Sequence, residues 1–311
     1  MHPQAALTEF LNELQSLDRK PSTLRFYRSL LNGFISFLAT RGIDDTPAID
    51  RSAIRAFFAN LSTLELSTST RAAYDRTIRT FLKFCLAEGW LETNPMAGRP
   101  RLKALRSRPD TLTLDEIRAL LDTCDDTPIS VRDRAIMLML LDTGLRASEL
   151  CDLVPDRVRV DGDRGLVYVP AGESKGVNDR SIPIWTETVR TLNTWLDLRP
   201  EADTVFTAFS GRRTPTEHRL TPSGLNQMIR RRCHTAEITG KKRLCHIWRH
   251  TFASRYILGS NGHGGDLESL RLLLGHSSLD TVRIYLTFQV HDLSEKHFAL
   301  SPVRQLYDNS G

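Results

Sequence analysis

The segment 246–250 reads HIWRH and groups titratable and cationic side chains on one face of a predicted helix. His246, Arg249 and His250 stand at positions i, i+3 and i+4, which are neighbours on a helix surface. Two histidines at this spacing can bind zinc, but the glutamate of the HExxH motif is missing, and Arg249 would bring a positive charge beside the metal. The remaining chemistry is anion binding by the arginine, with histidines able to move a proton.

A second pair of charged side chains occurs in the segment 143–150, which reads TGLRASEL. Arg146 and Glu149 are three residues apart and, within a helix, would share one face as an ion pair. Adjacent Cys-His pairs at 233–234 and 245–246 lack the internal spacing of zinc ligands, so neither predicts a metal site.

Three further side chains with catalytic potential are spread along the second half of the chain. His276 follows a helix end predicted at Gly275. Tyr285 lies nine residues later on a predicted helix with an apolar face, and Lys175 falls in a turn between two β-rich stretches. Each of these residues, taken singly, is explained better by packing or solvation than by catalysis. Only their combination indicates a function.

The elements expected to position these residues are mainly helical. One helix begins at Thr113, where Thr113 and Glu116 form a capping box. Alternating or β-rich segments predict strands at 157–160, 165–169 and 180–184. Helical periodicity then predicts helices at about 185–198, 222–236, 246–258, 266–274 and 279–290. The predicted fold class is mainly α with a small antiparallel β-sheet.

The first part of the chain predicts a separate helical domain. Four helices are expected, at about 4–17, 22–41, 48–61 and 68–88, with leucine and aromatic stripes that are most simply core. The stretch from Asn94 to Pro109 is rich in proline and basic residues and contains no acid, as an extended linker would. The expected organisation is therefore a helical domain at 1–94, a basic linker at 95–110 and a second domain at 111–311.

Composition excludes several classes of protein. The chain has 311 residues and a net charge of +5, with no apolar run near the ~20 residues of a membrane-spanning helix. Its start lacks the pattern of a cleaved signal peptide, and its five cysteines include no CxxC pair. We expect a cytoplasmic protein with no membrane partner. Residues 212–249 hold ten arginines and lysines against two acids, which suits a phosphate-binding face as well as a solvated one.

Taken together, these motifs resemble those of the tyrosine recombinases, also called phage integrases. Residues 143–150 match the family's TGLRxxEL box, and 246–250 match its HxLRH box except that Trp248 replaces leucine. Leu274-Gly-His276 matches the LGH box, and Tyr285 stands at the expected distance from it. The resemblance covers about residues 110–290. The helical segment before it resembles the family's SAM-like core-binding domain in length and helical pattern.

The resemblance implies a site-specific recombinase that cleaves and rejoins DNA through a 3′-phosphotyrosyl intermediate and a Holliday junction, without a cofactor or metal. Tyr285 would be the nucleophile and Lys175 would protonate the leaving 5′-oxygen. The remaining catalytic residues would be Arg146, His246, Arg249 and His276, which bind the phosphate or move its protons, with Glu149 orienting Arg146.

The resemblance also implies partners. These are double-stranded DNA with inverted-repeat core sites, enclosed by the two domains as a clamp, and a homotetramer on DNA or a heterotetramer with a paralogous recombinase. The segment 291–311 would reach a neighbouring protomer, and the protein would associate with the nucleoid. Candidate phosphate contacts are Arg230, Arg231, Lys241, Lys242 and Arg243.

Two other functions use the same residue types. A type IB topoisomerase shares the tyrosine and the cations, but the helical first domain and the LGH box favour a recombinase. A catalytically inactive DNA-binding regulator is the second alternative, and the complete set of catalytic positions opposes it. Chromosome-dimer resolution and mobile-element integration both stay open. The stretch 301–304 reads SPVR where Xer-type enzymes tend to carry His-Pro-Arg, which slightly favours a mobile-element or plasmid recombinase.

Overall fold

The computed structural model describes residues 1–103, 110–171, 179–211, 214–240, 244–259, 264–276, 278, 279 and 282. The chain divides into two compact units, Met1–Ser107 and Arg108–Gly311, each of which is considered by itself. The predicted fold class is confirmed, because both units are built mainly of helices and the sheets are small and antiparallel. Among the helices of the described residues, none is long and apolar enough to cross a membrane.

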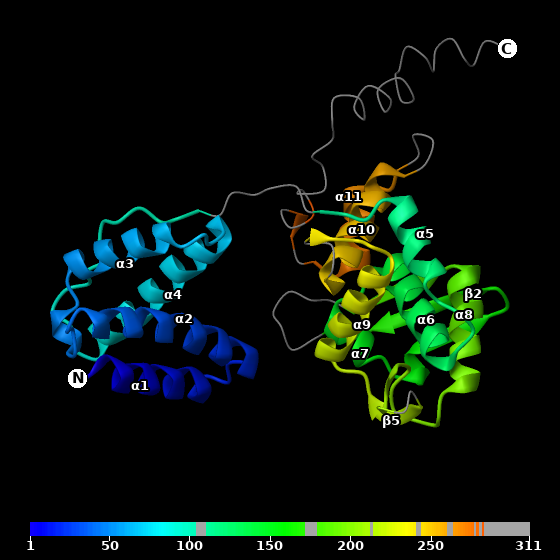
Figure 1. Ribbon diagram of the computed structural model, residues 1–311, viewed down its shortest axis with the longest axis horizontal. Helices are drawn as coiled ribbons and strands as arrows, with labels where there is room; N and C mark the ends of the chain where they lie inside the picture. The colour runs from blue at the N-terminus through cyan, green and yellow to red at the C-terminus, as the bar shows by residue number, and fades with distance from the viewer. Residues whose placement is uncertain are drawn as a thin grey trace, which may run out of the picture. The chain divides into compact units, whose positions relative to one another are not determined.

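The first unit consists of the four predicted helices and one short 3₁₀ turn, η1 (Thr46–Ala48) (Figure 1). Three helix starts have clear local causes: Pro21 occupies the first helical position of its helix, and the side chains of Asp50 and Ser67 accept backbone hydrogen bonds from Ala53 and Thr70. The helices are α1 (Pro3–Ser16), α2 (Pro21–Thr40), α3 (Arg51–Thr63) and α4 (Thr68–Ala87).

The predicted leucine and aromatic stripes form the core of this unit. Phe34 and Phe57 pack edge to face with ring centroids 5.0 Å apart, and Phe10 and Phe81 do so at 5.7 Å. Their burial shows that the stripes serve to pack the four helices together.

The first residues of the predicted linker pack on the first unit. Met96 is buried in its core. Arg79, held by the buried carboxylate of Asp75 at 2.8 Å, donates hydrogen bonds to the carbonyls of Met96, Arg99 and Pro100 at 3.2, 2.8 and 3.1 Å. The chain is therefore anchored as far as Pro100.

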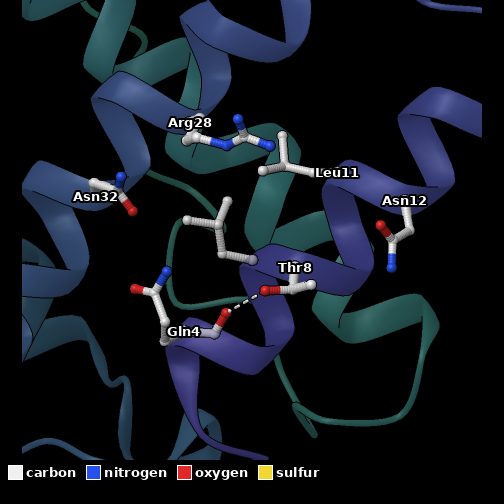
Figure 2. A pocket seen from close by; sticks show the side chains of 7 residues that line it. Gln4, Thr8, Leu11, Asn12, Arg28 and Asn32 are labelled. Carbon is white, nitrogen blue, oxygen red and sulfur yellow. Dashed lines mark hydrogen bonds between the residues drawn. The ribbon is translucent and has the colours of Figure 1, made fainter.

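A small pocket of about 120 Å³ lies between α1 and α2 (Figure 2). Thr8 Oγ1 at its edge donates to the carbonyl of Gln4 at 3.1 Å. Arg28 is the one titratable side chain of its lining, which argues against a reaction centre there. The other lining residues are Gln4, Leu7, Thr8, Leu11, Asn12 and Asn32.

The second unit is organised around α6 (Pro128–Thr143), which packs against α8 (Thr186–Leu198), α10 (Cys245–Leu258) and strand β3 (Arg180–Ile184). Its buried side chains join those of the surrounding elements in one hydrophobic cluster. The described helices around α6 are α5 (Leu114–Asp122), α7 (Ala147–Cys151), α8 (Thr186–Leu198), α9 (Pro222–Thr235), α10 (Cys245–Leu258) and α11 (Leu267–Leu274), with a 3₁₀ turn η2 (Pro155–Arg157).

The described residues of this unit also form two antiparallel sheets. The predicted sheet has the order β1 (Val158–Asp161), β2 (Arg164–Val169), β3 (Arg180–Ile184). Its last pair is Val169 with Arg180, so β2 and β3 are joined by the connection that carries Lys175; residues 172–178 lie outside the described residues. The second sheet, β4 (Thr207–Phe209) with β5 (Pro215–Arg219), was not predicted, because both strands are short and β5 is polar without alternation.

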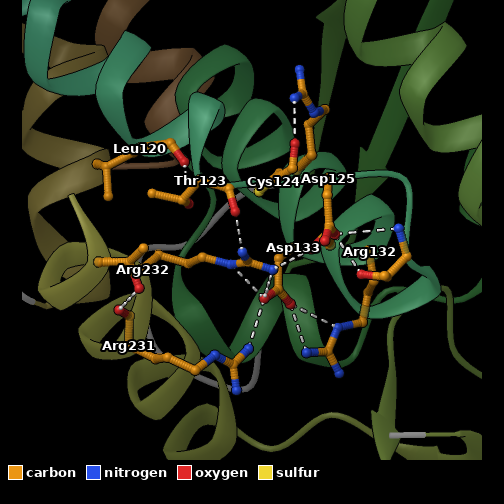
Figure 3. A network of polar contacts seen from close by, with 12 residues as sticks. Leu120, Thr123, Cys124, Asp125, Arg132, Asp133, Arg231 and Arg232 are labelled. Atoms are coloured by element: carbon orange, nitrogen blue, oxygen red, sulfur yellow. Dashed lines mark hydrogen bonds and ion pairs between the residues drawn. The ribbon is translucent and has the colours of Figure 1, made fainter.

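A buried ion cluster joins α6 to α9 (Figure 3). Asp133 is fully buried, and its carboxylate accepts hydrogen bonds from Arg132 at 2.7 Å, from Arg231 at 2.8 Å and from Arg232 at 2.9 Å. Arg232 also donates to the carbonyl of Thr123 at 2.7 Å. The two buried arginines, Arg132 and Arg232, thus have structural roles, although Arg232 belongs to a run of three arginines that looks like basic surface.

Candidate active site

Arg146 is placed by a sharp end to α6. Gly144 adopts a left-handed backbone conformation (φ 61°), which ends the helix after Thr143 and turns the chain. Arg146 then precedes α7 as its N-cap residue, rather than lying within a helix as its spacing to Glu149 had suggested. Glu149 accepts hydrogen bonds from both the backbone N–H of Arg146 at 2.8 Å and its guanidinium at 2.6 Å.

Glu149 is shared with a second arginine from the sheet. Arg180 Nη2 donates to Glu149 Oε2 at 2.7 Å. Burial alone would raise the pKa of Glu149, but the charge of Arg180 and the hydrogen bonds from Arg146 and Arg180 bring this pKa below its usual value. The carboxylate therefore stays ionised and fixes the orientation of Arg146.

Arg249 joins α10 to the ends of two other helices. Its buried guanidinium donates to the carbonyl of Gly144 at the end of α6 and to the carbonyl of Leu274 at the end of α11, both at 2.7 Å. Terminal helix carbonyls lack partners within their own helix, and a cation is favourable at that end. These contacts hold Arg249 beside Arg146, since Gly144 is two residues before it.

His276 completes the contact with Arg249. Gly275 ends α11 in a left-handed conformation (φ 63°), and the Nε2 atom of His276 lies 2.7 Å from Arg249 Nη2. Because a guanidinium only donates, Nε2 must accept, so the ring is neutral and carries its proton on Nδ1. Burial first, and then the charges of Arg249, Arg146 and Arg180, lower the pKa of His276 to about 4. A neutral ring with Nδ1–H can donate to a phosphate oxygen.

His246 lies on the exposed side of the same group. Its imidazole is nevertheless partly buried, and this partial burial first, then the charges of Arg249 and Arg146, lower the pKa of His246. The neutral ring can accept a proton. Its ring stands edge to face with that of His250, with centroids 4.4 Å apart. The pKa of His250 is lowered to about 4, first by burial of its ring and then by electrostatic interaction with His246 and Arg249. We call Arg146, His246, Arg249 and His276 the arginine–histidine cluster.

The structure describes only part of the residue set selected from the sequence. Four of the six proposed catalytic residues form the arginine–histidine cluster, while Lys175 and Tyr285 lie outside the described residues. Among the candidate DNA contacts, Arg230 is exposed on α9, and Arg231 is half-exposed with its guanidinium bound to Asp133. Lys241, Lys242 and Arg243 also lie outside the described residues, as does the segment 291–311.

Arg180 is the site residue that sequence reasoning missed. Its signal is the period of the strand RSIPI, in which Arg180, Ile182 and Ile184 all point inward. An arginine at an inward strand position requires a buried acceptor, and Glu149 supplies it.

The cluster is suited to a dianionic or monoanionic phosphate group. It presents two arginines with fixed geometry and two neutral histidines, with one carboxylate that is already bound to arginine. No group of three or more His, Cys, Asp or Glu side chains that could hold a metal ion occurs among the described residues.

Comparison with known proteins agrees with these motifs. The sequence profile of the phage integrase family matches residues 110–291, and that of the phage integrase N-terminal SAM-like domain matches residues 7–89. The chain is 29% identical over 289 residues to "Tyrosine recombinase XerC" of Salmonella typhi, covering 91% of this chain and 90% of the relative.

Solved structures share the fold. A crystal structure of XerA recombinase is 26% identical, with a TM-score of 0.50 over 96% of this chain and 99% of that one. The Tn1549 transposon integrase in complex with transposon right end DNA is 16% identical, with a TM-score of 0.74 over 97% of this chain and 100% of that one. The family predicted from the TGLRxxEL, HxLRH and LGH boxes is thus confirmed: the chain belongs to the phage integrase family, the tyrosine recombinases.

Proposed function

We propose that this tyrosine recombinase cleaves and rejoins DNA at specific sites, for integration, excision or dimer resolution, with Tyr285 as nucleophile. The observation that carries the proposal is the arginine–histidine cluster. It gathers three segments far apart in sequence, and the 2.7 Å contact between Arg249 and His276 fixes its centre. A structure of a XerH site-specific recombinase bound to a palindromic difH substrate, which shares the fold at a TM-score of 0.71, gives a precedent for DNA as the partner.

The cluster would compensate charge on the scissile phosphate. Attack on a phosphodiester gathers negative charge on its nonbridging oxygens, and fixed donors stabilise that charge without reorganisation. Arg146 and Arg249 would each donate to a nonbridging oxygen, and His276 would add a hydrogen bond from Nδ1. The two arginines would therefore take the part that metal ions take in other phosphoryl transfers.

Proton transfer would involve the remaining residues. Tyr285 would attack phosphorus through its phenolic oxygen, with His246 accepting the proton or binding the phosphate. Lys175 would give a proton to the departing 5′-oxygen, so that a phosphotyrosyl ester and a free 5′-hydroxyl result. Attack by the 5′-hydroxyl of a partner strand reverses the step, so strand exchange would need neither ATP nor another cofactor.

The proposed assembly is a clamp on DNA. Residues 1–94 would form the core-binding domain, 95–110 a linker along the DNA backbone, and 111–311 the catalytic domain with its tail on a neighbouring protomer. The substrate would be double-stranded DNA with inverted-repeat core sites, bound by a homotetramer, or a heterotetramer with a paralogous recombinase, in the cytoplasmic nucleoid. Arg230, Arg231, Lys241, Lys242 and Arg243 are proposed phosphate contacts.

Covalent trapping tests the proposal. DNA fragments selected by binding from the source genome would be made into nicked substrates, on which cleavage releases a short strand and prevents religation. Incubation with a chelator should give a protein–DNA adduct that survives denaturant and is absent in Tyr285→Phe. Tight, specific binding with no adduct would instead support a DNA-binding regulator.

The same DNA site separates a recombinase from a topoisomerase. A plasmid with two copies of the site should yield recombinant products and Holliday junctions in a gel assay. Relaxation of a supercoiled plasmid that carries one site, with no exchange between two sites, would contradict the recombinase function and favour the topoisomerase.

A further inference from the structure

Arg180 is buried at the start of β3, between two of the proposed catalytic side chains. On one side its Nη2 donates to Glu149 at 2.7 Å, and Glu149 in turn holds Arg146. On the other side its Nε donates at 2.8 Å to the carbonyl of Leu273 in the last turn of α11, which ends at Leu274, two residues before His276. One guanidinium therefore joins Glu149 in α7 to the last turn of α11.

The surroundings of Arg180 fix its position closely. A Cβ atom on Gly275 would lie 2.7 Å from Arg180 Nη1 and 3.1 Å from Cζ, so only glycine lets the guanidinium reach this depth. Nη1 itself is buried and has no acceptor among the described residues. The arginine also lines a pocket of about 180 Å³ together with Arg271 and His276. A buried cation placed in this way costs solvation free energy, which the ion pair with Glu149 offsets.

We propose that Arg180 is a positioning residue of the phosphate site, which sets the orientation of Arg146 through Glu149 and the place of His276 through the end of α11. The inference rests on the proposed function, because a phosphate must react at this site for position to matter. Arg180 need not touch the DNA. Its effect is to hold Arg146 and His276 in a fixed position relative to each other, although they belong to elements far apart in sequence.

Lysine at position 180 would break this arrangement while keeping the charge. The donors of a lysine ammonium group all lie on one nitrogen atom, so lysine cannot bind both Glu149 and the Leu273 carbonyl as the planar guanidinium does. Misplacement of catalytic groups by an ångström costs about 10²-fold in rate, so Arg180→Lys should slow adduct formation about 10- to 100-fold. The rate is measured in a single turnover with saturating protein, so that DNA affinity does not contribute.

A change in the substrate distinguishes positioning from a general loss of structure. A methylphosphonate at the scissile position removes the negative charge that Arg146 compensates, so the orientation of Arg146 then matters less. The rate defect of Arg180→Lys should therefore shrink to within about 3-fold of wild type on this substrate. A defect of equal size on phosphate and methylphosphonate substrates would overturn the proposal.

Arg132 provides a matched control in the same unit. It is also buried, and it donates to a carboxylate, that of Asp133, and to a backbone carbonyl, that of Thr207. Arg132→Lys should lower the thermal midpoint yet leave the single-turnover rate of the folded protein near wild type. If Arg180→Lys behaves in the same way, with lowered stability and an unchanged rate, the positioning role is refuted.

Two further outcomes are also decisive. If Arg180→Lys does not fold, Arg180→Gln is measured in its place; failure of both to fold while Arg132→Lys folds would make Arg180 a folding residue and overturn the proposal. Absence of any Tyr285-dependent adduct with the wild-type chain would remove the proposed function itself. A wild-type adduct with an undiminished rate in the variants would remove only the role of Arg180.

Discussion

Replacing Gly144 by alanine should disturb the fold and the site together, because this glycine ends α6 in a crowded place. Its φ of 61° is unfavourable for a residue with a side chain. A Cβ atom there would overlap the ring of Phe252 on α10 and lie 3.0 Å from Cδ2 of Leu274 on α11. These neighbours adjoin Arg249 and His276, so relief of the overlap would move the arginine–histidine cluster.

The expected decrease in the free energy of unfolding has two parts. The left-handed conformation costs alanine about 1–2 kcal/mol. Inserting a methyl group into a packed core costs about 1–3 kcal/mol more. Gly144→Ala should thus lower the free energy of unfolding by about 2–5 kcal/mol, and it should also slow formation of the covalent DNA adduct.

Gly162 provides the control, since it has nearly the same backbone angle (φ 58°), but no atom of the described residues lies within 4 Å of a Cβ added there. Gly162→Ala should lose only the conformational part, about 1–2 kcal/mol. Urea denaturation followed by tryptophan fluorescence measures the difference, because three of the four tryptophans, Trp185, Trp195 and Trp248, belong to the second unit. Equal destabilisation by the two substitutions would refute the packing at Gly144.

Three other changes test separate parts of the structure. Asp133→Ala removes the carboxylate that accepts hydrogen bonds from three arginines, and it should lower the free energy of unfolding in urea by about 3–5 kcal/mol. Arg231→Ala, at the half-exposed edge of the same ion cluster, should lower it by about 1 kcal/mol or less. Equal losses would contradict the buried network around Asp133. Arg79→Met should release residues 96–100 and raise the amide hydrogen exchange of residues 96–99; unchanged exchange there would show that Arg79 does not anchor this segment. In the folded state the pKa values of His250 and His276 are lowered from 6.5 to about 4. Between these pH values the unfolded chain therefore binds more protons than the folded one, and the free energy of unfolding should fall as the pH decreases through this range. Equal urea midpoints near pH 7 and pH 5 would contradict those shifts.

Much of the helical scaffold could be predicted because its signals are local. The stripe of Phe34 and Leu38 in α2 and the capping box at Thr113 each occur within a few turns of chain, and the structure contains both. The prediction for Arg146 was wrong in one respect: Arg146 lies immediately before α7, as its N-cap residue, and not inside a helix. The spacing to Glu149 is the same in both cases, and only the left-handed Gly144 shows that one helix ends and another begins.

What the sequence could not reveal depends on distant partners. The contact of Arg180 with the Leu273 carbonyl joins residues 93 positions apart, and no local sequence pattern predicts it. Arg232 lies in a run of three arginines that resembles a basic surface, yet Asp133, 99 positions earlier, accepts its hydrogen bond in the interior. Burial of a charged side chain follows from tertiary packing, which periodicity alone does not specify.

The identity of the covalent bond tests the central claim most directly. The adduct trapped on a nicked substrate would be digested with protease and nuclease, and the nucleotide-bearing peptide identified by mass spectrometry. We expect a nucleotide joined through its 3′-phosphate to Tyr285, formed in the presence of chelator. A nucleotide on another residue, or a bond through a 5′-phosphate, would contradict the mechanism proposed for this cluster.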